Sequence, residues 1–164
     1  MTVYKENLDN KIKDDLVGRN LNWDDYKTHK AEKAKYARFN ITANQSIPNG
    51  QNTQIIWNTK TSFKGEDFCE IDSVTRQVKV LKTGLYQIQV GVEFGGSNVG
   101  QRVLYNQLLL QTTYPNTTAP CYVTMQEFVY LNANALYECR VMQSSGGALD
   151  VRTNVTALYI RRVI

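Results

Sequence analysis

The sequence predicts an all-β domain of two packed sheets that follows a short helical segment, and three observations support this prediction. The first is the alternation of apolar with mostly polar residues in Gly84–Phe94, which is the period of a β-strand. The second is the recurrence of similar short segments, separated by breaks rich in Gly, Pro and Asn. The third is a change of composition near Arg38, because the residues before it are rich in Lys, Asp and Glu. We therefore expect helix in residues 1–38 and strands in residues 39–164.

The leading segment has the spacing of an amphipathic helix. Its apolar residues recur at intervals of four and three, with a break near Gly18 (Leu8, Ile12, Leu16, Trp23 and Tyr26). From Trp23 onward, charges of opposite sign stand three or four positions apart, as on a solvated helix. Such a helix is marginal alone and gains stability by packing, here against copies of itself.

After Arg38 the expected strands are short and closely spaced. Turn signals separate them, of which Ile47–Gly50 is the clearest, because its Pro presets φ and its Asn-Gly tolerates positive φ. Eight or nine such strands are typical of a sandwich or barrel. They are expected near Ala37–Ala43, Thr53–Thr59, Phe68–Asp72, Val74–Val80, Leu85–Phe94, Gln101–Thr113, Tyr122–Leu131, Ala135–Gln143 and Asn154–Val163.

Some of these strands carry apolar side chains on both faces. In Tyr122–Leu131, one face has Tyr122, Phe128 and Tyr130, and the opposite face is aliphatic. A strand with one aqueous face should not have this composition. Oligomerisation would cover the second face; the alternative is that tyrosine simply tolerates the surface.

The sequence favours a binding or structural protein over an enzyme. Its one histidine, His29, stands in the charged helical segment with no cysteine or serine motif around it. No catalytic residue, cofactor or metal ligand is assigned. A group of acids lies near one turn, but its spacing matches no calcium-binding loop, and we expect a solvated sheet edge (Glu66, Asp67, Glu70 and Asp72). A calcium site between subunits, or the carboxylate pair of a cell-wall hydrolase, remains the alternative.

Charge and cysteine content limit the partners and the compartment. The net charge of +4 is spread among interleaved acids and bases, so we expect no nucleic-acid partner. The three cysteines have no Cys-x-x-Cys spacing, which argues against a disulfide framework. No apolar run follows Met1, so we expect neither a signal peptide nor a membrane span, and folding in a reducing cytoplasm.

Several segments together resemble the C1q/TNF-like jelly-roll family. The clearest is Gln77–Val80 followed by Thr83–Ile88, which resembles that family's strand, Gly-x-Tyr step and alternating strand. The likeness covers roughly residues 37–164, and it departs from the family at Asn134–Ala135, where many members have Gly-Asp. Further segments follow in the family's order: Phe39–Ala43, Ile55–Asn58, Phe128–Ala133 and Ala157–Arg162.

The resemblance implies a homotrimer, in which three jelly rolls pack about a threefold axis through aromatic and aliphatic side chains. The candidates for this interface are Tyr86, Phe94, Tyr137 and Tyr159. For each of them, the core of a single sandwich is an equally good interpretation.

The segment Trp23–Glu32 is similar to helical linkers in fibre and baseplate proteins of phages of Gram-positive bacteria. This similarity implies a non-enzymatic virion protein, in which residues 1–38 attach to other virion proteins and trimerise. Residues 39–164 would then form a head that binds a host-surface ligand, such as a cell-wall glycan, with no membrane partner. The alternative is a head fibre or capsid decoration without its own receptor.

Ligand binding by such a head would use loops on the rigid sheets. The loops Gly95–Gly100, Thr112–Ala119 and Ser144–Asp150 are rich in Ser, Thr, Asn and Gly, which also are ordinary turn residues. The candidate ligand-binding residues are Ser97, Asn98, Tyr114, Asn116, Thr117, Ser144 and Ser145.

Overall fold

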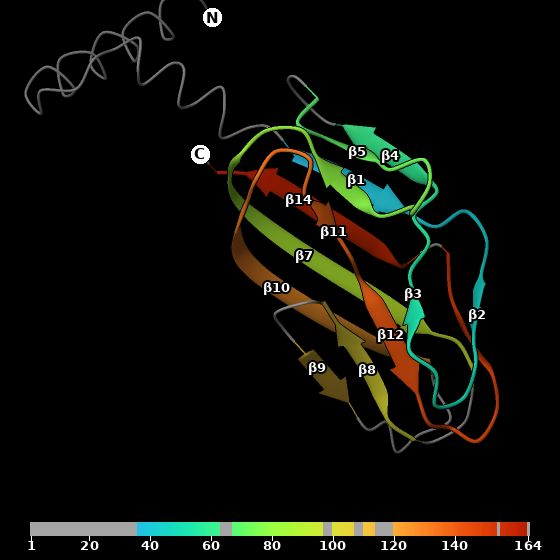
Figure 1. Cartoon of the computed structure of the whole chain (residues 1–164). Coiled ribbons are helices and arrows are strands. Elements are labelled where there is room, and N and C mark those ends of the chain that lie inside the picture. Colours follow the sequence, from blue (N-terminus) through green and yellow to red (C-terminus); the bar gives the residue numbers. More distant parts are fainter. Residues whose placement is uncertain are drawn as a thin grey trace, which may run out of the picture. The chain divides into compact units, whose positions relative to one another are not determined.

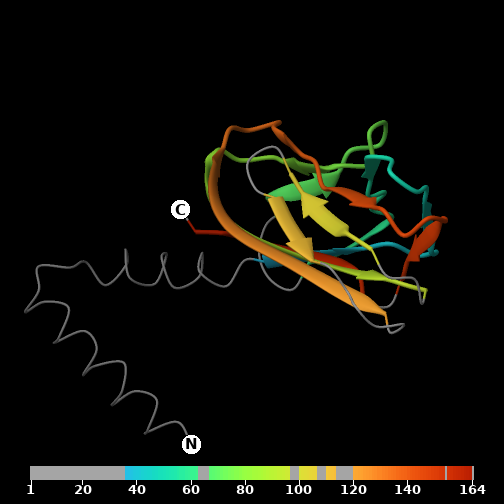
Figure 2. The ribbon, with the colours of Figure 1, turned by 90° about the horizontal axis from the view of Figure 1, so that it is seen from below.

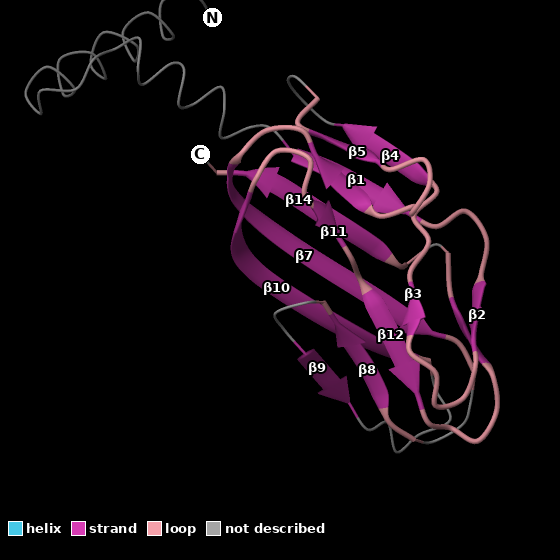
Figure 3. Ribbon diagram, viewed as in Figure 1, coloured by secondary structure: helices cyan, strands magenta, loops and turns pink. Residues whose placement is uncertain are grey.

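The computed structural model describes residues 36–62, 67–96, 100–106, 110–113, 120–153 and 155–163. The chain divides into two units, Met1–Ala34 and Lys35–Ile164, and all the described residues belong to the second unit. This unit is all-β, and no helix occurs in its described residues (Figures 1 and 3). The helical prediction for residues 1–35, including His29, lies outside the described residues.

The strands are mostly short, and two of them, β7 and β10, have 11 residues each. In chain order they are β1 (Tyr36–Asn40), β2 (Gln45–Ile47), β3 (Thr53–Gln54), β4 (Thr59–Ser62), β5 (Cys69–Ile71), β6 (Val78–Val80), β7 (Gly84–Phe94), β8 (Arg102–Tyr105), β9 (Leu110–Thr113), β10 (Cys121–Leu131), β11 (Leu136–Tyr137), β12 (Arg140–Gln143), β13 (Leu149–Val151) and β14 (Ala157–Arg162).

The largest sheet is organised around β7. One edge of β7 pairs with β10 over its whole length, from Leu131↔Gly84 to Cys121↔Phe94. Its other edge pairs with β14 and then, at Phe94, with β13. The order continues from β14 to β1 and β4, while β13 pairs with β2. All of these pairings are antiparallel.

A second layer packs against one side of this sheet (Figure 2). It consists of the sheet β3-β12-β8-β9 and the small sheet β11-β6-β5. The side chains between the layers form one apolar cluster, in which Trp57, Phe39 and Tyr86 are fully buried. The apolar alternation in β7 faces this core, because Tyr86, Ile88, Val90, Val92 and Phe94 are each at most 1% exposed.

Two predicted strands are wrong as single elements. Residues 101–113 form a hairpin, because β8 pairs with β9 from Arg102↔Thr113 to Tyr105↔Leu110. Residues 135–143 are divided at Glu138, since β11 pairs with β6 in one sheet and β12 pairs with β8 in another. Apolar content alone does not show where a chain turns back or changes sheet. The short strands β2, β4 and β13 were not predicted.

The predicted turns have the backbone that their residues favour. Gly50 has φ of 69°, as expected for the Pro-Asn-Gly turn. Asn134 has φ of 68°, a conformation that asparagine tolerates better than most residues. Asparagine at this position therefore permits the positive φ of the turn.

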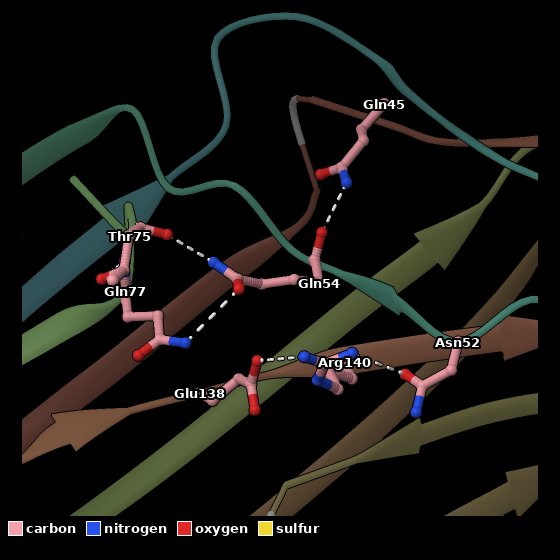
Figure 4. Close-up of polar contacts among 7 residues, drawn as sticks. All are labelled: Gln45, Asn52, Gln54, Thr75, Gln77, Glu138 and Arg140. Atoms are coloured by element: carbon pink, nitrogen blue, oxygen red, sulfur yellow. Dashed lines mark hydrogen bonds and ion pairs between the residues drawn. The ribbon is translucent and has the colours of Figure 1, made fainter.

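Side-chain hydrogen bonds support the short strands of the second layer and connect β3 to β2 of the large sheet (Figure 4). Gln54 is the centre: its carbonyl oxygen accepts from Gln45 Nε2 at 2.5 Å, and its Nε2 donates to the Thr75 carbonyl at 2.6 Å. Nearby, Arg140 pairs with Glu138 at 2.7 Å and donates to Asn52 Oδ1 at 3.4 Å. These bonds fix the two-residue strand β3 beside β12.

One carboxylate of the long strand β10 faces the core. Glu127 is 8% exposed, and its Oε1 accepts hydrogen bonds from the Tyr137 hydroxyl and from Asn106 Nδ2. Asn106 Nδ2 also lies 2.7 Å from the Tyr137 hydroxyl oxygen. The network satisfies a buried polar group and connects β10 to β11 and to the residue that follows β8.

We predict that stability falls at alkaline pH, because burial raises the pKa of the Cys69 thiol to about 12. The unfolded chain loses this proton above the ordinary thiol pKa of 9.0, whereas the folded chain keeps it. The folded state then binds more protons, so the free energy of unfolding falls as pH rises. Cys69 contributes about 1.4 kcal/mol per pH unit over this window. Urea titrations between about pH 8 and pH 10.5, at one protein concentration, measure the fall.

The variant Cys69→Ala should lose less stability over the same range, although it starts from a lower value. Part of the slope remains, because burial also raises the pKa of Cys139 and of Tyr137. Val78→Ala is the control, since it weakens the same core without removing a titrating group. Equal slopes for wild type and Cys69→Ala would contradict the prediction.

Candidate functional site: an exposed aromatic sheet face

The large sheet carries aromatic side chains on the side that faces away from the core. On β10, Tyr122, Phe128 and Tyr130 are 50%, 62% and 64% exposed. Because neighbours directly opposite in a sheet share one side, the register continues this surface across β7 to β14 and β1. There, Tyr159 and Tyr36 are each 40% exposed. We call this surface, with these five rings, the aromatic face.

Polar side chains lie between the rings of the aromatic face. Gln126 on β10 is opposite Gln89 on β7, which is opposite Tyr159 on β14. Arg38 on β1 follows in the same row, with its guanidinium carbon 5.4 Å from the centre of the Tyr159 ring. This distance is within the range of a cation–π contact.

The ring of Tyr122 lies across the sheet at Gly91. A Cβ atom on Gly91 would overlap the Tyr122 hydroxyl, so the close approach requires glycine. Burial is the main cause that raises the pKa of Tyr122, and its neighbours Tyr159 and Glu93 raise it further, while Arg38 lowers it. Tyr122 therefore reaches from the edge strand β10 towards the centre of the aromatic face.

Two arginines of the aromatic face have buried nitrogens without a partner. Within the described residues, Arg38 Nε and Arg161 Nε are shielded from solvent, and the N–H group of each donates no hydrogen bond. Shielded donors usually find an acceptor. Contiguous exposed rings on a folded domain are typical of a contact surface. The exposed rings therefore make the aromatic face a candidate surface for contact with another protein.

The four predicted interface residues separate into two groups. Tyr86, Phe94 and Tyr137 lie in the core of a single chain, at 0%, 1% and 6% exposure, so they do not belong to the exposed surface. Tyr86 packs against Phe68 with ring centres 6.1 Å apart, and its hydroxyl donates to the Lys82 carbonyl. Only Tyr159 lies on the aromatic face. Sequence reasoning identified Tyr122, Phe128 and Tyr130 as a strand face that needs cover, but it did not include them among the four interface candidates.

Two of the predicted ligand-binding residues make hydrogen bonds that hold their own loop in place. Ser144 Oγ accepts from the Gln101 N–H at 3.1 Å, and Ser145 Oγ donates to Gln143 Oε1 at 2.7 Å. Gln143 is fully buried, and its Nε2 donates to the carbonyls of Ile47 and Gly147 at 3.0 and 2.7 Å. The remaining candidates lie outside the described residues: Ser97, Asn98, Tyr114, Asn116 and Thr117.

The acidic group predicted near a turn does not converge on a common point. Asp67 pairs with Lys60 at 2.7 Å, and Glu70 pairs with Lys79 at 3.3 Å. Asp72 accepts from the Thr75 N–H at 2.7 Å and closes a turn. Glu66 lies outside the described residues. In the part of the chain that the structure describes, no group of three or more His, Cys, Asp or Glu side chains could hold a metal ion.

The described residues also contain no helix that is long and apolar enough to cross a membrane. Cys69, Cys121 and Cys139 are free thiols.

Two antiparallel layers with this strand order form a C1q/TNF-like jelly roll. One solved structure that shares the fold is the Eiger TNF from S. frugiperda, with a TM-score of 0.52 and 14% identity over 79% of this chain and 92% of that one. Another is murine APRIL, with a TM-score of 0.50 and 15% identity over 78% of this chain and 98% of that one. A third is the vertex protein P5 of phage PRD1, with a TM-score of 0.52 and 13% identity over 80% of this chain and 98% of that one. The fold therefore also resembles that of a phage structural protein. No family model matches the chain, and a search of curated proteins finds no match.

We predict that Gln143→Met lowers the free energy of unfolding by about 2–4 kcal/mol, because several buried hydrogen bonds of the 144–147 loop are lost together. Urea titration measures the change. Gln51→Met, at an exposed position of a neighbouring turn, is the control and should change stability by less than about 0.5 kcal/mol. A loss for Gln143→Met no larger than for the control would contradict the prediction.

Proposed function

We propose that this chain is a homotrimeric structural protein of a phage virion, in which three jelly rolls pack through their aromatic faces. The observation that carries the proposal is the aromatic face itself, which is exposed in the single chain and borders shielded arginine nitrogens. The resemblance to the C1q/TNF-like family, whose members are generally homotrimers, supports the number of copies. The fold shared with S. frugiperda Eiger TNF and murine APRIL agrees with this.

The energetics favour burial of this face. Removal of one aromatic side chain from water contributes roughly 1.5–3 kcal/mol, and the face carries five partly exposed rings in each chain. Long side chains between them, such as Gln89 and Gln126, supply hydrogen-bonding groups for the rim of an interface. A tyrosine alone tolerates water, but Phe128 has no polar atom and is 62% exposed. It therefore argues most strongly against a solvated face.

The virion assignment has two supports. The vertex protein P5 of phage PRD1 shares the fold over 98% of its chain. The segment Trp23–Glu32 is similar to linkers in phage fibre and baseplate proteins. In the proposal, residues 1–38 attach to other virion proteins and trimerise, and residues 39–164 form a non-enzymatic head. Contact of the head with a carbohydrate on the host surface is part of the proposal; the second candidate is a fibre or decoration protein without a receptor.

We predict that light scattering at low micromolar concentration gives three times the monomer mass of 18.7 kDa for the full chain. A shortened chain that begins at Lys35 should also be trimeric, because the aromatic face lies entirely in that unit. Phe128→Asp should shift the shortened chain to monomer, since an unpaired carboxylate would be buried at the interface. The mass of each variant measures this directly.

Val74→Asp is the matched control, because Val74 is an 86% exposed apolar residue in the turn between β5 and β6. It should leave the trimer intact. The shortened chain could be a monomer with and without the substitutions, while the full chain is a trimer. In that case the leading segment holds the trimer together, and the interface proposal fails. A monomeric full chain would remove the homotrimer altogether.

A further inference from the structure

A polar hollow lies at the end of the domain opposite to the point where the chain enters it. The chain enters β1 at Tyr36, which is opposite Arg161 near the end of β14 (Figure 1). At the other end of the same sheet, Asn40 is opposite Ala157, and Phe94 ends β7 beside Val151. The loops at this second end are therefore at the end of the sheet that is opposite to the entry of the chain into β1.

The hollow is formed by three loops that are far apart in the sequence. It has a volume of about 280 Å³, near the lower end of the range for small-ligand pockets. One of these segments joins β1 to β2, the second follows β7, and the third contains β13 and the residues beside it. We call it the distal hollow; it is lined by Asn44, Gly95, Gly96, Ala148, Leu149, Asp150 and Arg152.

The side chains of the distal hollow offer both donors and an acceptor. Asn44 Oδ1 accepts from the Thr153 N–H at 3.2 Å, so this bond orients the amide and leaves its Nδ2 as a donor. Arg152 donates one terminal N–H to Glu93 at 3.2 Å, which leaves further N–H groups. The carboxylate of Asp150 is exposed and makes no hydrogen bond or ion pair with any described residue.

Two glycines allow side chains beside the distal hollow to pack closely against the backbone. A Cβ atom on Gly95 would lie 2.8 Å from Arg152 Nε, and one on Gly96 would lie 2.6 Å from Leu149 Cδ2. Gly96 also has φ of 100°, which side-chain-bearing residues rarely adopt. Gly95 is fixed by its N–H bond to the Asp150 carbonyl at 2.6 Å. The wall thus combines exposed backbone, one apolar side chain and polar groups.

We propose that the distal hollow binds a neutral saccharide. The Asp150 carboxylate can accept from one hydroxyl group of a sugar ring, and the Asn44 amide can donate to a neighbouring hydroxyl group. A polyanion is disfavoured, because Glu93 pairs with the positive charge of Arg152 and Asp150 stays uncompensated. The inference rests on the proposed function, since it assigns the receptor site of the head.

A single site of this kind is weak. It is shallow and no aromatic side chain lines it, so stacking on a sugar ring contributes nothing. Three copies in one trimer, and many trimers on one particle, would raise the overall affinity by avidity.

Saturation-transfer NMR of the full chain tests the proposal, because it detects weak ligands on a large protein. The probes are glucose, galactose, rhamnose, N-acetylglucosamine and N-acetylgalactosamine, with polyglycerol phosphate as the polyanion. We expect saturation transfer to at least one of the sugars. The signal should weaken roughly tenfold or more in Asp150→Ala, which removes the charged acceptor, and in Asn44→Asp, which keeps the bond to Thr153 N–H but removes the donor.

Asp67→Ala is the matched control, because Asp67 is an exposed aspartate that lies outside the distal hollow, and its variant should bind like wild type. Transfer to none of the sugars, transfer to polyglycerol phosphate alone, or binding that survives both hollow variants would overturn the proposal. Light scattering on the same samples separates this failure from failure of the proposed function, which would appear as a monomer.

Discussion

The pairing of β7 with neighbouring strands on both of its edges is the constraint on which the rest of the structure depends. A strand with hydrogen-bonded neighbours on each side cannot slip by one residue without moving every side chain to the other face. The register Val92↔Val123 and Ile88↔Ile160 therefore fixes which residues of β10 and β14 enter the core. The same register fixes the outward residues, so the aromatic face is a necessary consequence of how the core is built.

The ends of β7 also determine where the loops meet. Gly84 pairs with Leu131 at the end where the chain enters the domain, and Phe94 pairs with Cys121 and Val151 at the other end. Because Gly95 donates to the Asp150 carbonyl directly beyond this last pair, the loops after β7 and around β13 are in contact. The aromatic face thus lies on one side of the large sheet, whereas the distal hollow lies at one end of it.

The sequence predicted what depends on local alternation and missed what depends on distant contacts. Alternation identified the strand that became β7 and the need to cover one side of β10. Alternation could not predict that Tyr137 is buried, because its strand β11 has only two residues and so shows no repeating pattern. Alternation put Tyr86 and Phe94 on the same face of the strand as Val90, but it left open whether that face packs in the core or at an interface. The sequence named two of the loops that line the distal hollow, Gly95–Gly100 and Ser144–Asp150. It did not show that they meet Asn44 and Arg152, which are more than a hundred positions apart.

Strand β10 shows why the domain is built for a contact on its outer side. Glu127 points into the core and Phe128, its neighbour, points out. A buried carboxylate is costly unless it is hydrogen-bonded, and Tyr137 with Asn106 supplies those bonds. Within one chain, nothing comparable offsets the exposure of Phe128 among the described residues. The inward half of the strand is thus complete in the monomer, and the outward half carries the rings that the proposed trimer would cover.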